Sequence, residues 1–197
     1  MCHVVLQDPA FFRFLTGIDE ELAAATRLRG CRACGGPLHV ADYPRKPRGC
    51  PAGVREAYSR RLSFTCGRCN ARTTSASVRF AGRRVYLAVV LMLVSPPGSS
   101  SARGLCDRLR IPARTLKRWR TWWGQDFPST PFWQSVRERF MPPVTITQLP
   151  QSLLERFGAG AMTDRLVQLL RFVAPLSTAP RPSHSKVALD PQRMPIA

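Results

Sequence analysis

Two Cys-x-x-Cys pairs constrain the fold of this chain more than any other feature. Cys31 and Cys34 lie in "GCRACGG", and Cys66 and Cys69 lie in "TCGRCN". Two sulfurs three residues apart on a tight turn can face the same ion, and structural zinc takes four such ligands in a tetrahedron. Glycines that follow the pairs let backbone amides turn toward the sulfurs. The pattern therefore predicts one structural Zn²⁺ held by these four cysteines in a small β zinc ribbon.

The interval between the pairs, residues 35–65, is longer than the roughly 15–20 residues usual for such sites. It contains the basic, Pro- and Gly-rich stretch "YPRKPRGCPAGVREAYSRR", for which we predict a loop leaving the ribbon between its strands. His39 and Cys50 also lie in this interval, and the sequence leaves open whether either replaces one of the four ligands. Cys106 is predicted to be a small apolar core residue. Four cysteines leave no coordination position for water, so the metal is expected to be structural.

The charge balance predicts a polyanionic partner. The chain has 30 basic and 12 acidic residues and a formal net charge of +18, and nearly all of its cations are arginines. The planar arginine fork pairs with phosphates and with guanine edges. The longest apolar run, "VYLAVVLMLV", is well short of the roughly 20 residues of a membrane span. With no visible secretory signal, we expect a cytoplasmic, nucleoid-associated protein without a membrane partner.

The stretch "SARGLCDRLRIPARTLKRWRTWW" has the pattern of a helix-turn-helix, with helices at about 101–110 and 113–126. Pro112 suits the start of the second helix, and Ile111 and Leu116 are predicted to face inward with Leu109. Three tryptophans, Trp119, Trp122 and Trp123, are predicted mainly as packing residues. This phasing directs Arg114, Thr115, Lys117 and Arg118 outward, where a second helix of this kind contacts the major groove of DNA. The predicted DNA-binding residues are Arg114, Thr115, Lys117, Arg118, Arg120, Arg83 and Arg84.

The predicted fold is mainly α with a small β zinc ribbon, followed by a helix-turn-helix bundle and short C-terminal helices. Residues 1–29 are expected to form two short helices separated at Gly17, with Asp19 capping the second. The remaining units are the ribbon with its basic insertion loop, the helix-turn-helix domain, the C-terminal helices and a disordered tail: 30–82, 83–127, 128–174 and 175–197. Individual helices are predicted at about 83–94, 131–140, 151–157 and 162–173.

A zinc ribbon followed by "RFAGRRVYLAVVLMLV" and an arginine-rich helix-turn-helix resembles bacterial insertion-element, transposase-type DNA-binding proteins, over about 30–127. The resemblance implies a sequence-specific protein for double-stranded DNA that acts as a mobile-element accessory or regulator. A transposase partner and a homodimer stay open. A transposase joins DNA with metal ions held by carboxylates on a sheet, and the acids from Asp126 onward (Asp126, Glu138, Glu155, Asp164 and Asp190) lie in no apolar strand run, so we expect no enzyme activity. The alternative is a structural RNA- or ribosome-associated zinc-ribbon protein.

Overall fold

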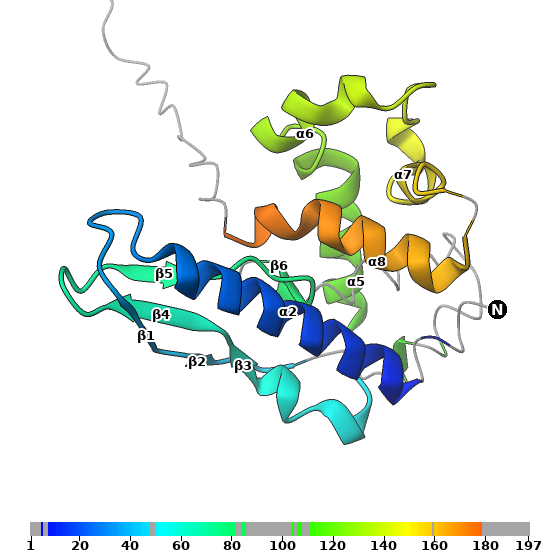
Figure 1. Ribbon diagram of the computed structural model, residues 1–197. Coiled ribbons are helices and arrows are strands. Elements are labelled where there is room, and N and C mark those ends of the chain that lie inside the picture. Colours follow the sequence, from blue (N-terminus) through cyan, green and yellow to red (C-terminus); the bar gives the residue numbers. More distant parts are fainter. Residues whose placement is uncertain are drawn as a thin grey trace, which may run out of the picture.

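The computed structural model describes residues 5, 8–47, 50–81, 84–85, 104, 106–107, 111–158 and 160–178. The protein is mainly helical, and a small antiparallel sheet region extends to one side of the helices (Figure 1). The helical elements are α2 Pro9–Arg29, η1 Ala52–Val54, η2 Ala57–Ser59, α5 Ala113–Thr121, η3 Trp122–Asp126, α6 Pro131–Val136, η4 Arg137–Arg139, η5 Ile146–Gln148, α7 Gln151–Leu154, α8 Met162–Val173 and η6 Ala174–Ser177. The strands are β1 Leu38–Val40, β2 Tyr43–Pro44, β3 Arg60–Arg61, β4 Ser63–Cys66, β5 Arg72–Thr74, β6 Phe80–Ala81 and β7 Arg84–Val85.

Helix α2 is one continuous helix, so the prediction of two short helices is wrong. It begins after Asp8, whose Oδ1 accepts a hydrogen bond from the Ala10 amide at 2.8 Å, and it ends at Gly30, where φ is +73°. Gly17 lies inside it. A glycine in a helix interior costs only about 1 kcal/mol relative to alanine. Burial of the apolar face on both sides of Gly17 outweighs that cost, because each buried side chain contributes about 1.5–3 kcal/mol. That face consists of Phe11, Phe12, Leu15 and Ile18.

The sheet that carries the cysteines has the strand order β1-β4-β5, and both pairings are antiparallel. Leu38 lies opposite Cys66 and Val40 lies opposite Phe64. The C-terminal half of α2 packs on this sheet through Ala23, which shares a small apolar core with Leu38 and Phe64. The turn between β4 and β5 extends away from helices α5 to α8 (Figure 1).

The insertion between the cysteine pairs is folded rather than a loop projecting from the ribbon. It forms β2, η1, η2 and β3, and β2 pairs with β3. Cys50, Val54 and Tyr58 are buried in the main core. The Tyr58 hydroxyl donates to the Phe12 carbonyl at 3.2 Å, which ties the insertion to α2. The apolar residues spaced through the stretch override its basic, Pro-rich composition, because their burial against α2 offsets the entropy cost of ordering the chain.

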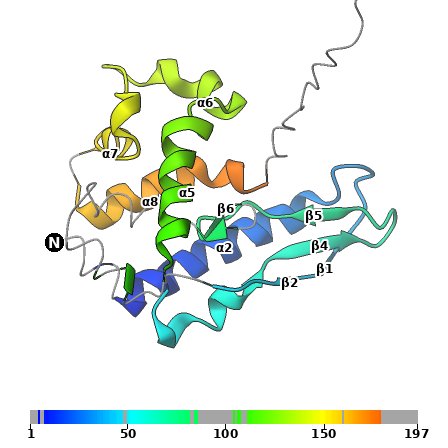
Figure 2. The ribbon, with the colours of Figure 1, turned by 180° about the vertical axis from the view of Figure 1, so that it is seen from behind.

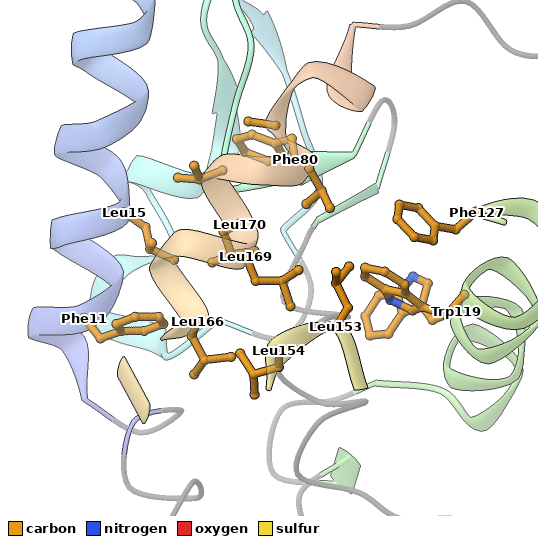
Figure 3. Packing of buried hydrophobic residues seen from close by; sticks show 14 of the residues in the cluster. Phe11, Leu15, Phe80, Trp119, Phe127, Leu153, Leu154, Leu166, Leu169 and Leu170 are labelled. Atoms are coloured by element: carbon orange, nitrogen blue, oxygen red, sulfur yellow. The ribbon is translucent and has the colours of Figure 1, made fainter. Parts of the chain in front are cut away.

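Helix α8 lies between α2 and α5, as opposite views of the molecule show (Figures 1 and 2). Its leucines Leu166, Leu169 and Leu170 lie between Phe11 and Leu15 of α2 on one side and the aromatic residues of the α5 region on the other (Figure 3). The predicted helix over 162–173 is confirmed with the same bounds. One core therefore joins α2, the insertion, the basic helix region and the C-terminal helices, which the sequence divides into separate units.

A buried ionic network joins α2 to the segment after the sheet. Asp19 is fully buried, and its carboxylate accepts hydrogen bonds from the Ser77 hydroxyl, the Val78 amide and Arg79 Nε at 2.5–2.7 Å. Arg79 is 2% exposed and also donates to the Ala57 carbonyl at 2.7 Å. The prediction that Asp19 caps a helix is therefore wrong. It lies in mid-helix and pairs with a buried arginine 60 residues away in sequence.

Two further predictions differ from the structure or lie outside it. The helix predicted at about 83–94 is replaced at Arg84–Val85 by strand β7, which pairs with β6, and residues 86–94 lie outside the described residues. The disordered tail predicted from 175 does not begin there, because Ser177 is buried and its hydroxyl accepts from the Ser77 amide at 3.0 Å. Residues 179–197 lie outside the described part of the chain.

Candidate metal centre and basic helix

The four predicted cysteines lie together at the end of the sheet remote from α5 to α8. The sulfurs of Cys31 and Cys69 are 3.6 Å apart, those of Cys34 and Cys66 are 3.5 Å apart, and all four lie within 4.8 Å of one another. Sulfurs that bind one tetrahedral ion with bonds of about 2.3 Å are roughly 3.8 Å apart. The four thiols therefore fit a single metal ion such as zinc without a large rearrangement.

The turn that holds Cys31 and Cys34, the first knuckle, follows directly from the end of α2. Gly30 ends the helix with a positive φ, and the Gly35 amide then donates to the Cys31 carbonyl at 2.8 Å. Gly35 also has a positive φ, of +67°, a conformation that favours glycine. Gly36 is needed for another reason: a Cβ at this position would lie 3.0 Å from the Cys66 sulfur and 3.3 Å from the Cys34 sulfur. The backbone at Gly36 thus closes one side of the site.

The turn that holds Cys66 and Cys69, the second knuckle, also has a residue in the left-handed conformation after its second cysteine, but that residue is not a glycine. Asn70 follows Cys69 as Gly35 follows Cys34, and its φ is +58°. Asparagine adopts this conformation more readily than most residues. The backbone amides of Cys69 and Arg68 lower the pKa of the Cys66 thiol to about 6, and the Arg68 amide lies 3.3 Å from that sulfur. Amides directed at a sulfur stabilise the thiolate, which is the form that binds metal.

Neither of the two other candidate ligands joins the cluster. Cys50 is buried in the main core, where burial raises the pKa of its thiol. His39 lies on β1 with its imidazole against Gly67, where a Cβ would be 2.6 Å from Nε2. In the described residues, the four cysteines are the one cluster of at least three histidine, cysteine or acidic side chains with a metal-binding geometry. Cys106 is buried in the main core, as predicted.

Helix α5 has one buried face and one cationic face. Leu116 and Trp119 are buried, and the same face continues through Trp123 and Phe127. These aromatic rings pack with Trp133 of α6, with neighbouring ring centroids about 5 Å apart. The predictions that Ile111 and Leu116 face inward and that Trp119 and Trp123 are packing residues are confirmed. The exposed cations of the opposite face are Arg114, Lys117 and Arg118.

Two predicted contact residues on α5 do not belong to that face. Thr115 is 6% exposed, so the prediction that it points outward is wrong. It follows Arg114 by one position, a rotation of about 100°, which places it on the core side beside Leu116. Arg120 is half-buried, and its Nε atom is enclosed by the protein. Burial raises the pKa of the Cys106 thiol, and the nearby charge of Arg120 acts in the opposite direction. It therefore lies on the flank of the helix.

Other parts of the predicted helix-turn-helix are described only in part. The backbone is helical at Gly104, Cys106 and Asp107, and the Ile111 amide donates to the Cys106 carbonyl at 2.8 Å. Both Cys106 and Ile111 are buried in the main core, and residues 108–110 lie outside the described residues. Arg83 lies outside the described residues, and only the backbone of Arg84 is described, in β7.

A second group of exposed cations lies at the end of α2 and on the sheet that carries the cysteines. Arg27 and Arg29 lie in the last turn of α2, where cations interact favourably with the helix dipole. Arg68 Nη1 donates to the Cys34 carbonyl at 3.3 Å, and Arg72 Nη2 donates to the Ala41 carbonyl at 2.7 Å. No acidic residue lies between Leu22 and Ala41 or between Ala57 and Ala81 in the sequence. The helical and cysteine patterns gave no role to these arginines, although the acid-free intervals that contain them are visible in the sequence.

Comparison of the chain with protein families, with curated proteins and with solved structures found no match. No helix among the described residues is both long enough and apolar enough to cross a membrane. The cysteine cluster and the distribution of exposed cations are therefore the features of the chain that point to a function.

Proposed function

We propose that this chain is a zinc-binding protein that recognises double-stranded DNA through α5, as a noncatalytic accessory or regulator of a mobile element. The observation that carries the proposal is the division of α5 into two faces. Leu116 and Trp119 hold the helix against the core, and Arg114, Lys117 and Arg118 are exposed on the opposite side. A helix anchored along one face by large apolar residues can present the other to a major groove without losing its support.

The exposed cations have the chemistry that such a helix needs. Arginine can donate two parallel hydrogen bonds to the O6 and N7 atoms of guanine, and lysine contacts guanine or phosphate. Arg114, Lys117 and Arg118 follow the i, i+3, i+4 spacing, so they form one row along the helix surface. The cations near the cysteine cluster, such as Arg29 at the end of α2 and the exposed Arg32 between Cys31 and Cys34, supply phosphate contacts that are independent of base sequence.

The metal has a structural part in this proposal. The small core around the cysteines contains Ala23, Leu38 and Phe64, with a few half-buried neighbours. A core of this size stabilises a fold weakly, and the free energy of binding zinc to four thiolates would supply the difference. Zinc with four sulfur ligands has no open position for a substrate, so its role is to hold the knuckles and the end of α2 together.

The DNA-binding proposal is tested by selecting preferred duplexes from a random pool with the zinc-loaded protein. Arg118→Ala should relax the base preference at one or two positions and cost about 1–3 kcal/mol of discrimination. Arg13→Ala is the matched control, because Arg13 is an exposed arginine on α2 and the change removes the same charge. The control should retain the preferred sequence. Identical selected sequences for the wild type and Arg118→Ala would refute readout by α5.

The same measurements address the alternative of a structural RNA-binding protein. Contacts made only to phosphates give affinity that falls with salt concentration and depends little on sequence. If every duplex binds equally and structured RNA binds more tightly at the same salt concentration, the cations serve RNA and the DNA proposal fails.

Zinc is tested by metal analysis of the purified chain. The geometry predicts one zinc ion per chain, lost in Cys66→Ser. Cys50→Ser is the matched control, because Cys50 is an equally buried cysteine that lies in the other core, and its zinc content should be unchanged. Full zinc retention after Cys66→Ser would contradict the assignment of the four ligands.

A further inference from the structure

The edge of the metal-binding sheet at β1 has an open apolar groove beside it. The groove lies between the C-terminal half of α2 and β1 and has a volume of about 690 Å³. Two exposed aliphatic side chains lie in this region: Leu28, which lines the groove and is 88% exposed, and Val40 of β1, which is 65% exposed. The lining residues are mostly apolar, and they include Ala24, Leu28, Pro37, Leu38 and Phe64.

The backbone of β1 adds hydrogen-bonding groups along this groove. The Ala41 amide donates to the Ser63 carbonyl and the Gly67 amide donates to the Pro37 carbonyl, so alternate residues of β1 exchange bonds with β4. In an antiparallel pair, the residues between those positions direct their N–H and C=O groups to the outer edge. These residues are Leu38 and Val40. Among the described residues, no strand pairs with β1 on that edge.

The charge around the groove selects the class of occupant. Arg27 and His39 line it, and Arg68 is held at the carbonyl of Cys34, shortly before β1. The acids nearest to the lining residues in the sequence are Glu21, which pairs with Arg171 at 3.5 Å, and Asp42, whose Oδ1 accepts from the Ser63 amide on the β4 side. A second copy of this chain would bring the same cations together, and the net charge of +18 opposes that pairing.

We propose that this edge binds an extended, acidic segment of a partner protein that carries apolar side chains. The segment pairs with β1 as an added strand and places an apolar side chain in the groove, while its carboxylates meet Arg27 and the neighbouring cations. Main-chain hydrogen bonds supply affinity in such strand addition, and the pocket beside the strand supplies specificity. Duplex DNA is a poorer occupant, because its phosphates use neither the apolar groove nor the strand edge.

The test is a selection of short peptides from a random display library against the full zinc-loaded chain, followed by binding of the selected peptides in solution. Ala24→Arg fills the groove, and Ala25→Arg makes the same change at an exposed neighbour that does not line it. Val40→Pro removes an outward N–H but no bond to β4, which an edge strand can tolerate. Selected peptides should be rich in acidic and apolar residues. Their affinity should fall about tenfold or more in Ala24→Arg and Val40→Pro and stay within about twofold in Ala25→Arg.

Hydrogen exchange gives a second measurement that does not depend on either variant folding normally. A bound peptide should slow exchange of the Leu38 and Val40 amides in the wild-type chain. The proposal fails if the library yields no acidic enrichment, or if Ala24→Arg and Ala25→Arg strengthen binding equally, as simple charge attraction would. A dimer that dissociates in Val40→Pro would assign the edge to a second copy. Duplex DNA that protects the two amides, where the selected peptides do not, would assign it to nucleic acid.

Discussion

The buried pair of Asp19 and Arg79 should be one of the most sensitive points for the stability of the fold. Asp19→Ala removes a carboxylate that accepts three hydrogen bonds, and it leaves the Ser77 hydroxyl, the Val78 amide and Arg79 Nε without that partner. The side chains of Asp19 and Arg79 are 0% and 2% exposed, so water cannot replace the lost bonds without opening the core. The charge of Arg79 would stay buried.

The expected loss of unfolding free energy is about 3–5 kcal/mol, the usual cost of removing one partner of a buried ion pair. The remaining contacts of Arg79, with the Ala57 carbonyl and the faces of the Tyr58 and Phe80 rings, keep part of its environment and favour the lower half of that range. Whole domains have a stability of about 5–15 kcal/mol, so this variant would be close to unfolding.

Urea denaturation of the zinc-loaded chain, followed by tryptophan fluorescence, measures the change. Glu20→Ala is the matched control: it removes an acid from the next, exposed position of α2 and should change stability by no more than about 0.5 kcal/mol. If Asp19→Ala does not fold, the double variant Asp19→Leu with Arg79→Met removes both charges and should recover at least half of the loss. A loss below about 1 kcal/mol in Asp19→Ala, or no recovery in the double variant, would refute the reasoning.

Four further substitutions test other parts of the structure. Gly36→Ala should weaken zinc retention in a chelator titration, because its Cβ would lie 3.0 Å from the Cys66 sulfur. Gly17→Ala has open space around the new Cβ and should instead raise the unfolding free energy by about 1 kcal/mol, with zinc retention unchanged. Equal zinc retention in both would contradict the close packing at Gly36. Thr115→Val should leave DNA affinity unchanged in a fluorescence anisotropy titration, because Thr115 is buried, and a tenfold loss would return it to the interface. Tyr58→Phe should lower the unfolding free energy, measured by urea denaturation, by about 0.5–1.5 kcal/mol, because the hydrogen bond to the Phe12 carbonyl is lost. Burial raises the pKa of the Tyr58 hydroxyl, so this difference should be constant from pH 6 to pH 9. A difference that disappears in this range would contradict the bond.

Features encoded by short-range spacing could be predicted from the sequence. The Cys-x-x-Cys pairs indicate a metal site, because two ligands three residues apart can approach one ion whatever lies around them. The buried positions Leu116 and Trp119 and the exposed positions Arg114, Lys117 and Arg118 follow from the helical period. Helix α8 was predictable with its bounds, because its apolar residues recur with the same period between a preceding glycine-rich stretch and a following proline.

The sequence could not reveal how polar or ambiguous residues are used, because that depends on segments distant in the chain. Aspartate is a residue type common at helix N-termini, and only the approach of Arg79 makes Asp19 a buried ion-pair partner. The basic insertion resembles a loop, and only α2 supplies the apolar surface that buries Tyr58. Thr115 is at the margin between the two faces of α5, and packing against the core decided its side.

The sequence alone thus determined which residues could bind a metal and which face of α5 is cationic, since both depend on spacings of three or four residues. The tertiary structure alone decided that the register of β1 with β4 brings the cysteine pairs together, that α2 is continuous through Gly17, and that a groove opens beside β1. The physical reason is that a local pattern sets the direction of a side chain, whereas its burial, its partners and its solvent exposure depend on the chain segments that pack against it.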